Sequence, residues 1–315
     1  MIPQLKEDMR IVVTEFMDPP AVEQLRAYAE LIYDPQLVDD LPRMIAAATE
    51  CDAIIVRNRT QVRGELLASL ARCKVVGRLG VGLDNIDLNE CRSRGIQVIP
   101  ATGANANSVA EYVIATAMVL LRGSYASTAA VAAGTWPRDA LSKGRELAGT
   151  QLGLVGFGSI GQLTARLAKA LGMSVIAFDP ALKNDDVAFT NLGVVPSTLE
   201  HLIAASDVVS LHIPLVDATR DLFDHRRINA MKPGAVLINT ARGGIVDEAA
   251  VAAALRSGHL GGAALDVFKD EPLGATPHFQ DCPNLILTPH TAGLTAESNQ
   301  RVSSLVAEKV LQALR

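Results

Sequence analysis

The chain has 315 residues, of which 49% are hydrophobic and only 4% aromatic. At roughly 150 residues per domain, this length suggests two domains. Glycine and proline occur at ordinary frequencies and the apolar fraction can fill a large core, which excludes a disordered or collagen-like chain. The formal net charge is −5, from 29 basic and 34 acidic residues. Since no run of lysine and arginine stands out, we expect small-molecule partners and neither a nucleic acid nor a membrane surface.

Neither a membrane span nor a secretory leader is expected. The longest nearly apolar run, Tyr112 to Leu121, has about half of the roughly 20 residues that a bilayer requires, so it predicts a buried helix. Near the N-terminus, Lys6, Glu7 and Asp8 precede only a short apolar run, which is not typical of a signal peptide. We therefore expect a cytoplasmic protein.

The four cysteines are Cys51, Cys73, Cys91 and Cys282. They show no Cys-x-x-Cys spacing and no histidine at metal-ligand spacing. We expect small core residues in a reducing compartment, with neither a metal site nor a disulfide.

Short β-branched runs alternate with helical patterns along most of the chain, which predicts βαβ units, parallel sheets and an α/β fold. In the first hundred residues the expected strands are Arg10–Thr14, Glu30–Tyr33, Ala53–Val56, Lys74–Arg78 and Gln97–Ile99. A long helix is expected from Asn107 to Ala133, with a loop from Gly134 to Arg138. The second series of expected strands is Gln151–Val155, Ser174–Phe178, Asp207–Leu211, Ala235–Asn239, Gly261–Leu265 and Leu285–Leu287. Six strands suit a doubly wound sheet.

The last expected helix, Ala296 to Leu314, lies beyond the second series, and its apolar positions must cover another surface. We expect it to cover the first domain, which is then discontinuous. The prediction is two Rossmann-like doubly wound domains with a cleft between them. Residues 1–102 with 291–315 would form the substrate domain, and residues 103–290 the dinucleotide-binding domain.

The segment Gly156-Phe157-Gly158-Ser159-Ile160-Gly161 matches G-x-G-x-x-G. It follows an expected strand and opens a helical pattern, which is the context of a dinucleotide-binding loop. Gly156 would permit the tight turn, Gly158 would let the backbone approach a pyrophosphate, and Gly161 would let helix and strand pack closely. The alternative is a glycine-rich turn required for packing alone.

Asp179 ends the next expected strand, 18 residues past the last glycine. A carboxylate there can accept both hydroxyls of a ribose and would repel a 2′-phosphate, so it predicts NAD rather than NADP. Lys183 lies four residues on and would soften that discrimination. The alternative is an exposed residue at a strand end.

Ligands of open α/β sheets bind outside the carboxyl ends of the strands. The polar residues that follow the expected strands there are His212, Arg242, Asp266 and His290. An arginine offers a planar fork for a carboxylate, and a histidine exchanges protons near neutral pH. Glu271 could orient the imidazole of His290 and favour its protonated form. Taken singly, each residue has an alternative interpretation: Arg242 as a surface arginine, Glu271 as a solvated loop charge, and His290 as a satisfied histidine at a strand end.

Several of these segments share their order and spacing with one known family. They are residues 156–161, Ile238–Gly244, Ala264–Phe268 with Glu271-Pro272, and Thr288–Gly293. They resemble the signatures of the D-isomer-specific 2-hydroxyacid dehydrogenases. Gly80–Asp87 and Asn107–Glu111 extend the resemblance over essentially the whole chain.

The resemblance implies that Arg242 binds the substrate carboxylate, that His290 is the general acid and base, and that Glu271 pairs with His290. Backbone N–H groups near Val81 and Gly82 would also bind the carboxylate. We expect cofactor contacts from Gly156, Gly158, Ser159, Ile160, Gly161, Asp179, His212, Thr240, Ala241 and Asp266, and no metal. The expected reaction is reversible hydride transfer between NAD(H) and C2 of a small 2-hydroxy or 2-oxo acid.

Family members are usually dimers through the long helix and its loop, here near Asn107 to Arg145 with Trp136, so a homodimer is expected. Formate dehydrogenases resemble the chain but carry glutamine where Glu271 stands, which argues against them. Phosphite dehydrogenases keep a comparable triad and stay open. An NAD-sensing corepressor, similar to the C-terminal-binding proteins, is the alternative of a different class, and neither a basic patch nor an extended tail supports it.

Arg57 and Arg59 follow the strand Ala53–Val56, so at least one of them could face the substrate. In relatives that act on 3-phosphoglycerate, an arginine matching Arg57 meets the second anionic group. A phosphorylated, sulfonated or dicarboxylic acid is therefore a hypothesis, and the sulfolactate dehydrogenase branch fits it. The alternative is an exposed loop arginine. We expect no regulatory domain after the last helix.

Overall fold

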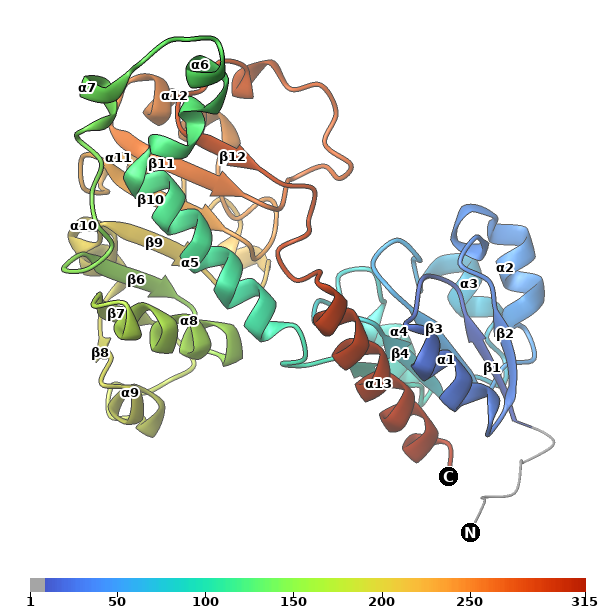
Figure 1. The fold of residues 1–315 in the computed structure, drawn as a ribbon. Coiled ribbons are helices and arrows are strands. Elements are labelled where there is room, and N and C mark those ends of the chain that lie inside the picture. The colour runs from blue at the N-terminus through green and yellow to red at the C-terminus, as the bar shows by residue number, and fades with distance from the viewer. Residues whose placement is uncertain (1–8) are drawn as a thin grey trace. The chain divides into compact units, whose positions relative to one another are not determined.

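The computed structural model describes residues 9–315, so Lys6, Glu7 and Asp8 lie outside the described residues. The chain divides into two compact units (Figure 1). The first unit runs up to Asn105 and takes up again at Leu294–Arg315, and the second is Ala106–Gly293. The functional roles expected for residues 1–102 with 291–315 and for residues 103–290 stay a prediction.

The first unit is a sheet of five parallel strands in the order β2-β1-β3-β4-β5. The strands are β1 (Arg10–Val13), β2 (Glu30–Tyr33), β3 (Ala53–Val56), β4 (Val75–Arg78) and β5 (Gln97–Pro100). The helices are α1 (Pro19–Arg26), η1 (Leu37–Asp39), α2 (Leu41–Ala48), α3 (Gly64–Ser69), α4 (Leu88–Ser93) and α13 (Ala296–Ala313).

The last helix, α13, covers one face of this sheet together with α1. Its buried residues Val306 and Val310 approach β4 so closely that a Cβ atom at Gly77 would lie 2.9 Å from both side chains. The apolar positions of the last helix therefore cover the first unit, as the sequence predicts. The other face packs against α2, α3 and α4.

The second unit is a sheet of seven parallel strands in the order β12-β11-β10-β9-β6-β7-β8. The strands are β6 (Gln151–Val155), β7 (Ser174–Phe178), β8 (Val195–Pro196), β9 (Val208–Leu211), β10 (Ala235–Asn239), β11 (Leu260–Leu265) and β12 (Leu285–Leu287). The helices are α5 (Ala106–Arg122), η2 (Ser124–Ser127), α6 (Thr128–Ala132), α7 (Arg138–Leu141), α8 (Ser159–Ala170), α9 (Val187–Leu192), α10 (Leu199–Ala205), η3 (Asp217–Thr219), α11 (His225–Asn229), α12 (Glu248–Arg256) and η4 (Pro277–Phe279). Helices α5 and α8 lie side by side on one face, and α10, α11 and α12 cover the other.

The predicted α/β class and parallel sheets are confirmed, and each expected strand is found within one residue of its predicted ends. The long helix expected from Asn107 to Ala133 is wrong as a single element. Helix α5 ends at Arg122 because Gly123 adopts a left-handed conformation, with φ of +69°. The short edge strand β8 was missed, since a two-residue strand ending in proline carries almost no periodic signal. No single helix within residues 9–315 is long and apolar enough to cross a bilayer.

The predicted burial of the cysteines is confirmed for three of the four residues. Cys51, Cys73 and Cys91 are buried and free. Cys282 is only half-buried, and its thiol donates to the carbonyl oxygen of His278 at 3.3 Å.

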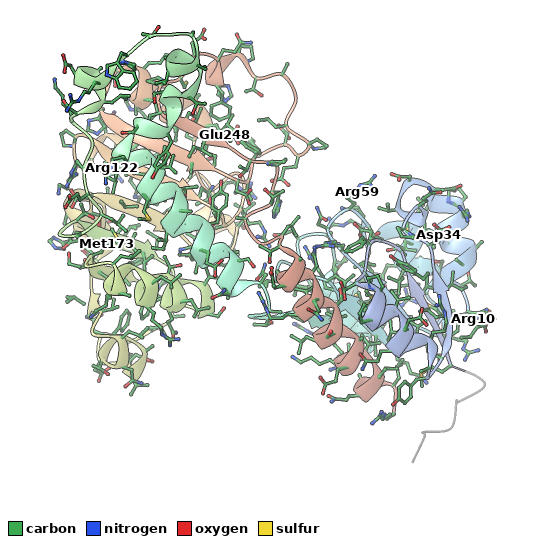
Figure 2. All side chains as sticks on the ribbon, in the orientation of Figure 1. Arg10, Asp34, Arg59, Arg122, Met173 and Glu248 are labelled. Carbon is green, nitrogen blue, oxygen red and sulfur yellow. The ribbon has the colours of Figure 1, made fainter. Side chains whose placement is uncertain are left out.

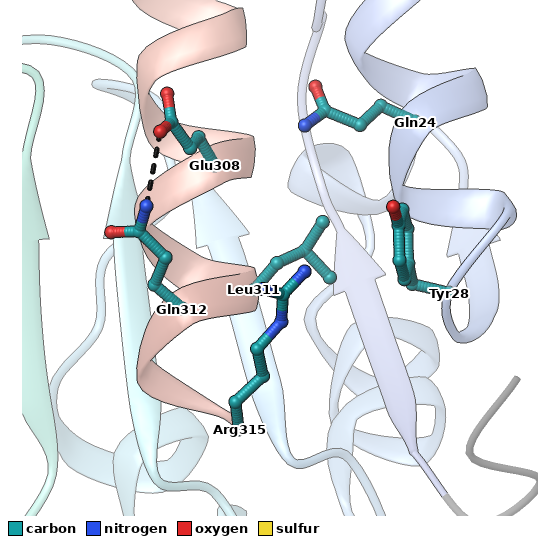
Figure 3. A pocket seen from close by; sticks show the side chains of 6 residues that line it. All are labelled: Gln24, Tyr28, Glu308, Leu311, Gln312 and Arg315. Atoms are coloured by element: carbon teal, nitrogen blue, oxygen red, sulfur yellow. Dashed lines mark hydrogen bonds between the residues drawn. The ribbon is translucent and has the colours of Figure 1, made fainter. Parts of the chain in front are cut away.

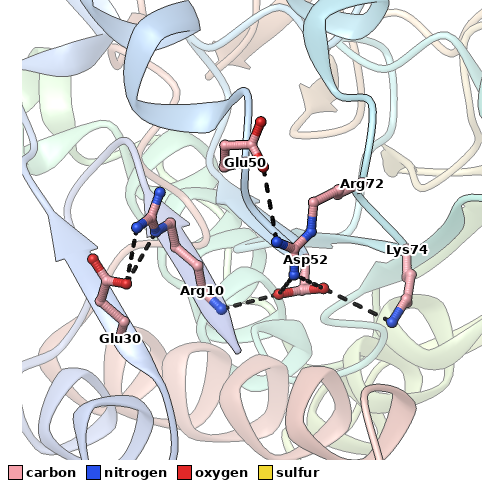
Figure 4. A network of polar contacts seen from close by, with 6 residues as sticks. All are labelled: Arg10, Glu30, Glu50, Asp52, Arg72 and Lys74. Atoms are coloured by element: carbon pink, nitrogen blue, oxygen red, sulfur yellow. Dashed lines mark hydrogen bonds and ion pairs between the residues drawn. The ribbon is translucent and has the colours of Figure 1, made fainter. Parts of the chain in front are cut away.

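A buried aspartate fixes the amino ends of the strands in each unit. Asp52, just before β3, accepts the N–H of Arg10 on β1 at 3.0 Å, and Arg72 and Lys74 flank it (Figure 4). Asp207, just before β9, accepts the N–H of Gln151 on β6 at 2.9 Å. These carboxylates stabilise the end of each sheet opposite to the predicted site residues.

A small hollow lies between α1 and α13 (Figure 3). It is lined by Gln24, Tyr28, Glu308, Leu311, Gln312 and Arg315. Tyr28 precedes β2, so the hollow lies toward the amino ends of the strands. The predicted site residues follow the carboxyl ends, and the hollow includes none of them.

Candidate active site

The predicted site residues follow the carboxyl ends of strands in both units. The second unit holds Gly156, Gly158, Ser159, Ile160, Gly161, Asp179, His212, Thr240, Ala241, Arg242, Asp266, Glu271 and His290. The first unit holds Arg57, Val81 and Gly82.

Two glycines of the loop between β6 and α8 are required by close packing. Gly156 has φ of +98°, and a Cβ atom there would meet the backbone carbonyl of His212, which follows β9. A Cβ atom at Gly161 would meet the carbonyl oxygen of Gly156. Since the strand order reverses between β6 and β9, the loop lies at the switch point where such sheets bind ligands.

Gly158 has the opposite environment. It is the N-cap of α8, and no atom of the described chain lies within 4 Å of the position that a Cβ atom would occupy. Open space at this backbone, next to the N–H groups of the first helical turn, is what the approach of a pyrophosphate requires. The loop therefore fits a dinucleotide.

Asp179 shapes the same loop from the end of β7. One oxygen of its carboxylate accepts the N–H of Phe157 at 2.8 Å, and the other accepts the N–H of Ala181 at 2.9 Å. The side chain is half-buried, and each oxygen retains a lone pair for a further donor. Its predicted contact with a ribose stays a prediction.

His212 directly follows β9, and its imidazole is uncharged at neutral pH. Its ring nitrogen Nε2 lies 3.1 Å from the hydroxyl of Ser210. Burial lowers the pKa of His212 to about 4. The imidazole can therefore bind a ligand by hydrogen bonding but does not supply a positive charge.

The turn after β10 carries Thr240, Ala241 and Arg242. Its shape depends on the buried Asn239, whose side chain accepts the N–H of Ala241 and donates to the carbonyl of Arg242, both at 3.0 Å. The Thr240 hydroxyl oxygen is buried, and within residues 9–315 it has no hydrogen-bond partner. Leaving such a group unpaired costs about 1–3 kcal/mol, which favours a bound partner at this position.

His290 and Glu271 form a direct pair. The imidazole Nδ1 lies 2.8 Å from one oxygen of Glu271, and the other oxygen accepts the N–H of Phe268 at 3.0 Å. Burial alone would raise the pKa of Glu271, but these bonds and the charge of Arg242 hold that pKa below its usual range. The carboxylate is therefore ionised and accepts the proton of Nδ1, which leaves Nε2 of His290 for another partner.

The backbone of His290 lies in the left-handed region, with φ of +55°. Its N–H donates to the carbonyl of Asp266 at 2.8 Å. The Asp266 carboxylate, 1% exposed, accepts the Thr288 hydroxyl and the N–H groups of Thr291 and Ala292 at 2.6–2.9 Å. Asp266 thus holds the segment that carries His290, and its predicted contact with the cofactor stays a prediction.

In the first unit, Val81 and Gly82 lie in the loop after β4. Their N–H groups donate to no atom of residues 9–315, so they are available to an anion. The buried Arg78 at the end of β4 lies beneath this loop, because a Cβ atom at Gly80 would collide with its guanidinium. Sequence reasoning missed the roles of two residues: Arg78 belongs to no motif, and Asn239 lies in the segment Ile238–Gly244 but was not singled out as a site residue.

The loop after β3 carries two arginines in different environments. Arg59 is exposed (Figure 2), and its guanidinium pairs with Asp39. Arg57 is half-buried, and its guanidinium contacts the side-chain oxygen of Asn299 at 2.5 Å and the Phe16 carbonyl at 3.4 Å. Burial lowers the pKa of Arg57 from its usual value, and the charge of Glu15 opposes that shift.

The glycine loop gives a testable prediction. Gly158→Ala adds a methyl group where the described chain leaves open space, at backbone angles that alanine adopts, so the melting temperature is expected to stay unchanged. The same methyl would obstruct a pyrophosphate and weaken NADH binding about tenfold or more, measured by fluorescence titration. Gly161→Ala is the matched control and should lower the melting temperature. Normal NADH affinity in Gly158→Ala would contradict the assignment.

Comparison with known proteins agrees with this geometry. Residues 114–292 match the D-isomer specific 2-hydroxyacid dehydrogenase, NAD binding domain. The chain is 50% identical to the (S)-sulfolactate dehydrogenase of Chromohalobacter salexigens over 96% of this chain and 98% of that protein. It is 40% identical to the D-3-phosphoglycerate dehydrogenase of Mycobacterium tuberculosis over 87% of this chain, but spans only 51% of that relative.

Among solved structures, the D-lactate dehydrogenase of Aquifex aeolicus, complexed with NAD and lactic acid, superposes with a TM-score of 0.84. It is 30% identical, over 97% of this chain and 95% of that one. The sequence matches cover nearly the whole chain and include the glycine loop, Arg242, Glu271 and His290. The chain therefore belongs to the D-isomer-specific 2-hydroxyacid dehydrogenase family and is an NAD-dependent oxidoreductase of 2-hydroxy acids.

Proposed function

We propose that the substrate is a small 2-hydroxy or 2-oxo acid with a second anionic group, and that a sulfonate fits this role. The observation that carries the proposal is the contrast between Arg57 and Arg59. The Arg59 charge is neutralised by Asp39, whereas the contacts of the Arg57 guanidinium are a carbonyl, an amide oxygen and the Phe16 ring. The 50% identity to an (S)-sulfolactate dehydrogenase supports the same substrate class.

In this proposal, three residues of the second unit act on C2 of the acid. Arg242 binds the carboxylate through its planar fork and polarises the neighbouring carbonyl. His290 uses Nε2 to take the proton of the C2 hydroxyl during oxidation and returns it to the carbonyl oxygen during reduction. Glu271 keeps Nδ1 protonated and orients the ring. The N–H groups of Val81 and Gly82 give the carboxylate further donors.

The cofactor supplies or accepts the hydride at C4 of its nicotinamide. We assign its pyrophosphate to the loop formed by Gly156, Gly158, Ser159, Ile160 and Gly161, and its adenosine ribose to Asp179. Thr240 and Asp266 are assigned to the nicotinamide side, and His212 and Ala241 to further contacts with the cofactor. The buried Thr240 hydroxyl supports this assignment, because a bound group would satisfy it.

The first prediction for this function concerns His290. Replacing it by glutamine removes the proton donor, so kcat for NADH-dependent reduction of a 2-oxo acid should fall by about 10² to 10⁴. NADH binding, followed by fluorescence, should persist. The control is His201→Gln, which changes an exposed histidine on α10 and should retain wild-type kcat. Near-normal turnover in His290→Gln would remove His290 from the mechanism.

The second prediction compares sulfopyruvate with pyruvate, which share a skeleton but differ in the sulfonate. Arg57→Gln should lower kcat/KM for sulfopyruvate by about 10- to 100-fold, the share of a hydrogen bond to a charged group. The value for pyruvate should change less than about threefold, and Arg59→Gln should alter neither. Equal losses of kcat/KM for both substrates, or no loss, would mean that Arg57 has a structural role only. Inactivity of the wild-type enzyme across 2-oxo acids would favour the NAD-sensing alternative.

We further propose a cytoplasmic homodimer whose contact includes the segment after α5. This segment exposes Tyr125 by 66%, Val131 by 43% and Trp136 by 75% in the single chain. Clusters of exposed large apolar side chains are typical of protein interfaces. The exposure supports the dimer that the family resemblance implies.

Trp136 is the only tryptophan, so its fluorescence reports on this surface. At micromolar concentration, light scattering should give twice the chain mass, and acrylamide should quench Trp136 poorly because the partner covers it. On dilution to the monomer, the quenching should rise. A dimer whose tryptophan remains fully quenchable would place the interface elsewhere.

A further inference from the structure

We propose that Glu15 is a positioning residue for substrate selection, acting through the backbone of the loop that carries Arg57. The inference rests on the proposed function, because it takes Arg57 as the group that binds the second anion. Glu15 belongs to no motif that the sequence analysis singled out. Within residues 9–315, its carboxylate forms no ion pair with the guanidinium of Arg57 and bonds instead to backbone N–H groups.

The strand order places Glu15 beside this loop. In the sheet β2-β1-β3-β4-β5, the connections leave β1 and β3 in opposite directions. Doubly wound sheets bind ligands at such a switch point, outside the carboxyl ends of the two strands. Glu15 lies two residues beyond β1, and Arg57 directly follows β3.

The Glu15 carboxylate accepts hydrogen bonds from three backbone N–H groups of the loop. One oxygen accepts the N–H of Arg57 at 2.8 Å and that of Thr60 at 3.0 Å, and the other accepts the N–H of Arg59 at 3.2 Å. The residue is only 5% exposed. A buried carboxylate with three donors is a strong local constraint, because each bond is charge-assisted.

The opposite side of the loop is held by Asn85. Its side-chain amide donates to the carbonyl of Arg57 at 3.0 Å and to that of Thr60 at 2.7 Å, and the residue is 6% exposed. Asn85 comes from the segment that also carries Val81 and Gly82. The Arg57 loop is thus fixed on its N–H side by Glu15 and on its carbonyl side by Asn85.

The backbone of this loop fixes the position from which the Arg57 side chain extends, and contacts with neighbouring residues fix the direction of its guanidinium. Phe16, next to Glu15, offers its carbonyl and its ring, whose centroid lies 5.7 Å from the guanidinium carbon of Arg57. Asn299 on α13 takes the third contact. A displaced loop would move Arg57 relative to all three, which is why Glu15 affects binding of the second anion without touching it.

Glutamine cannot replace this carboxylate. It has one acceptor oxygen, and its NH₂ group would face a backbone N–H that also donates. Glu15→Gln therefore leaves at least one loop N–H unpaired and loosens the loop, while Arg242, Glu271 and His290 keep their own contacts in the second unit. The substitution should weaken binding of the second anion and spare the chemical step.

The experiment measures kcat and KM of the full-length enzyme with NADH for sulfopyruvate and for pyruvate. In Glu15→Gln, KM for sulfopyruvate should rise about fivefold or more, while kcat and the KM for pyruvate change less than about twofold. Glu15→Asp keeps the charge but shortens the reach by one methylene, so its KM for sulfopyruvate should lie between those of the wild type and Glu15→Gln. If Glu15→Gln does not fold, Glu15→Asp decides the question by the same KM ratio.

Asp52→Asn is the matched control. Asp52 is also a buried carboxylate of the first unit that accepts a strand N–H, but it lies at the amino ends of the strands. Its substitution should lower the melting temperature and leave the ratio of the two KM values unchanged. A purely structural role of Glu15 would give this same result.

The outcomes separate this inference from the proposed function. If Arg57→Gln raises the KM ratio but Glu15→Gln and Glu15→Asp do not, the positioning role is overturned and the anion site stands. If Arg57→Gln itself leaves the ratio unchanged, the proposed anion site fails and takes the role of Glu15 with it. A parallel rise of both KM values in Glu15→Gln would also overturn the positioning role.

Discussion

The position of His290 depends on the buried carboxylate of Asp266. Three donors from the segment after β12 converge on this side chain, and the N–H of His290 bonds to the Asp266 carbonyl. These bonds hold His290 in a left-handed conformation that costs free energy for a residue with a Cβ atom. The segment can therefore turn after β12 and present the imidazole to Glu271, which comes from the loop after β11.

A similar contact between a polar side chain and the backbone holds three other loops that carry predicted site residues. Asp179 binds the N–H of Phe157 in the glycine loop, Asn239 closes the turn that bears Arg242, and Glu15 binds the loop that bears Arg57. Parallel strands end with backbone groups that the sheet no longer pairs, and buried loops must find other partners for them. A polar side chain near the strand end supplies the partner and at the same time fixes the direction of the predicted site residue.

These contacts between side chains and loop backbone explain how much of the fold and of the candidate site could be predicted from the sequence. The strands were predictable because β-branched runs bounded by turn residues are local signals. The glycine loop, Arg242 and His290 were predictable because they stand directly after such strands. The roles of Glu15 and Asn85 were not, since they depend on which loops become neighbours, and the strand order that decides this has no local signal. The end of α5 at Gly123 was missed because the alanine-rich pattern continues on both sides of the glycine.

The contrast between Arg57 and Arg59 follows from the same geometry. Both belong to one loop, yet Arg59 lies at the surface, where Asp39 neutralises it and water screens the pair. Arg57 is half-buried at the switch point, where neutral oxygens, an aromatic face and the nearby charge of Glu15 only partly replace the hydration that its charge has lost. A sulfonate bound there would complete that compensation, whereas an acid with one carboxylate would leave it incomplete. Under the proposed function, selectivity for a dianion would then arise from the incomplete solvation of one arginine, and the carboxylate that holds its loop would control that selectivity without touching the anion.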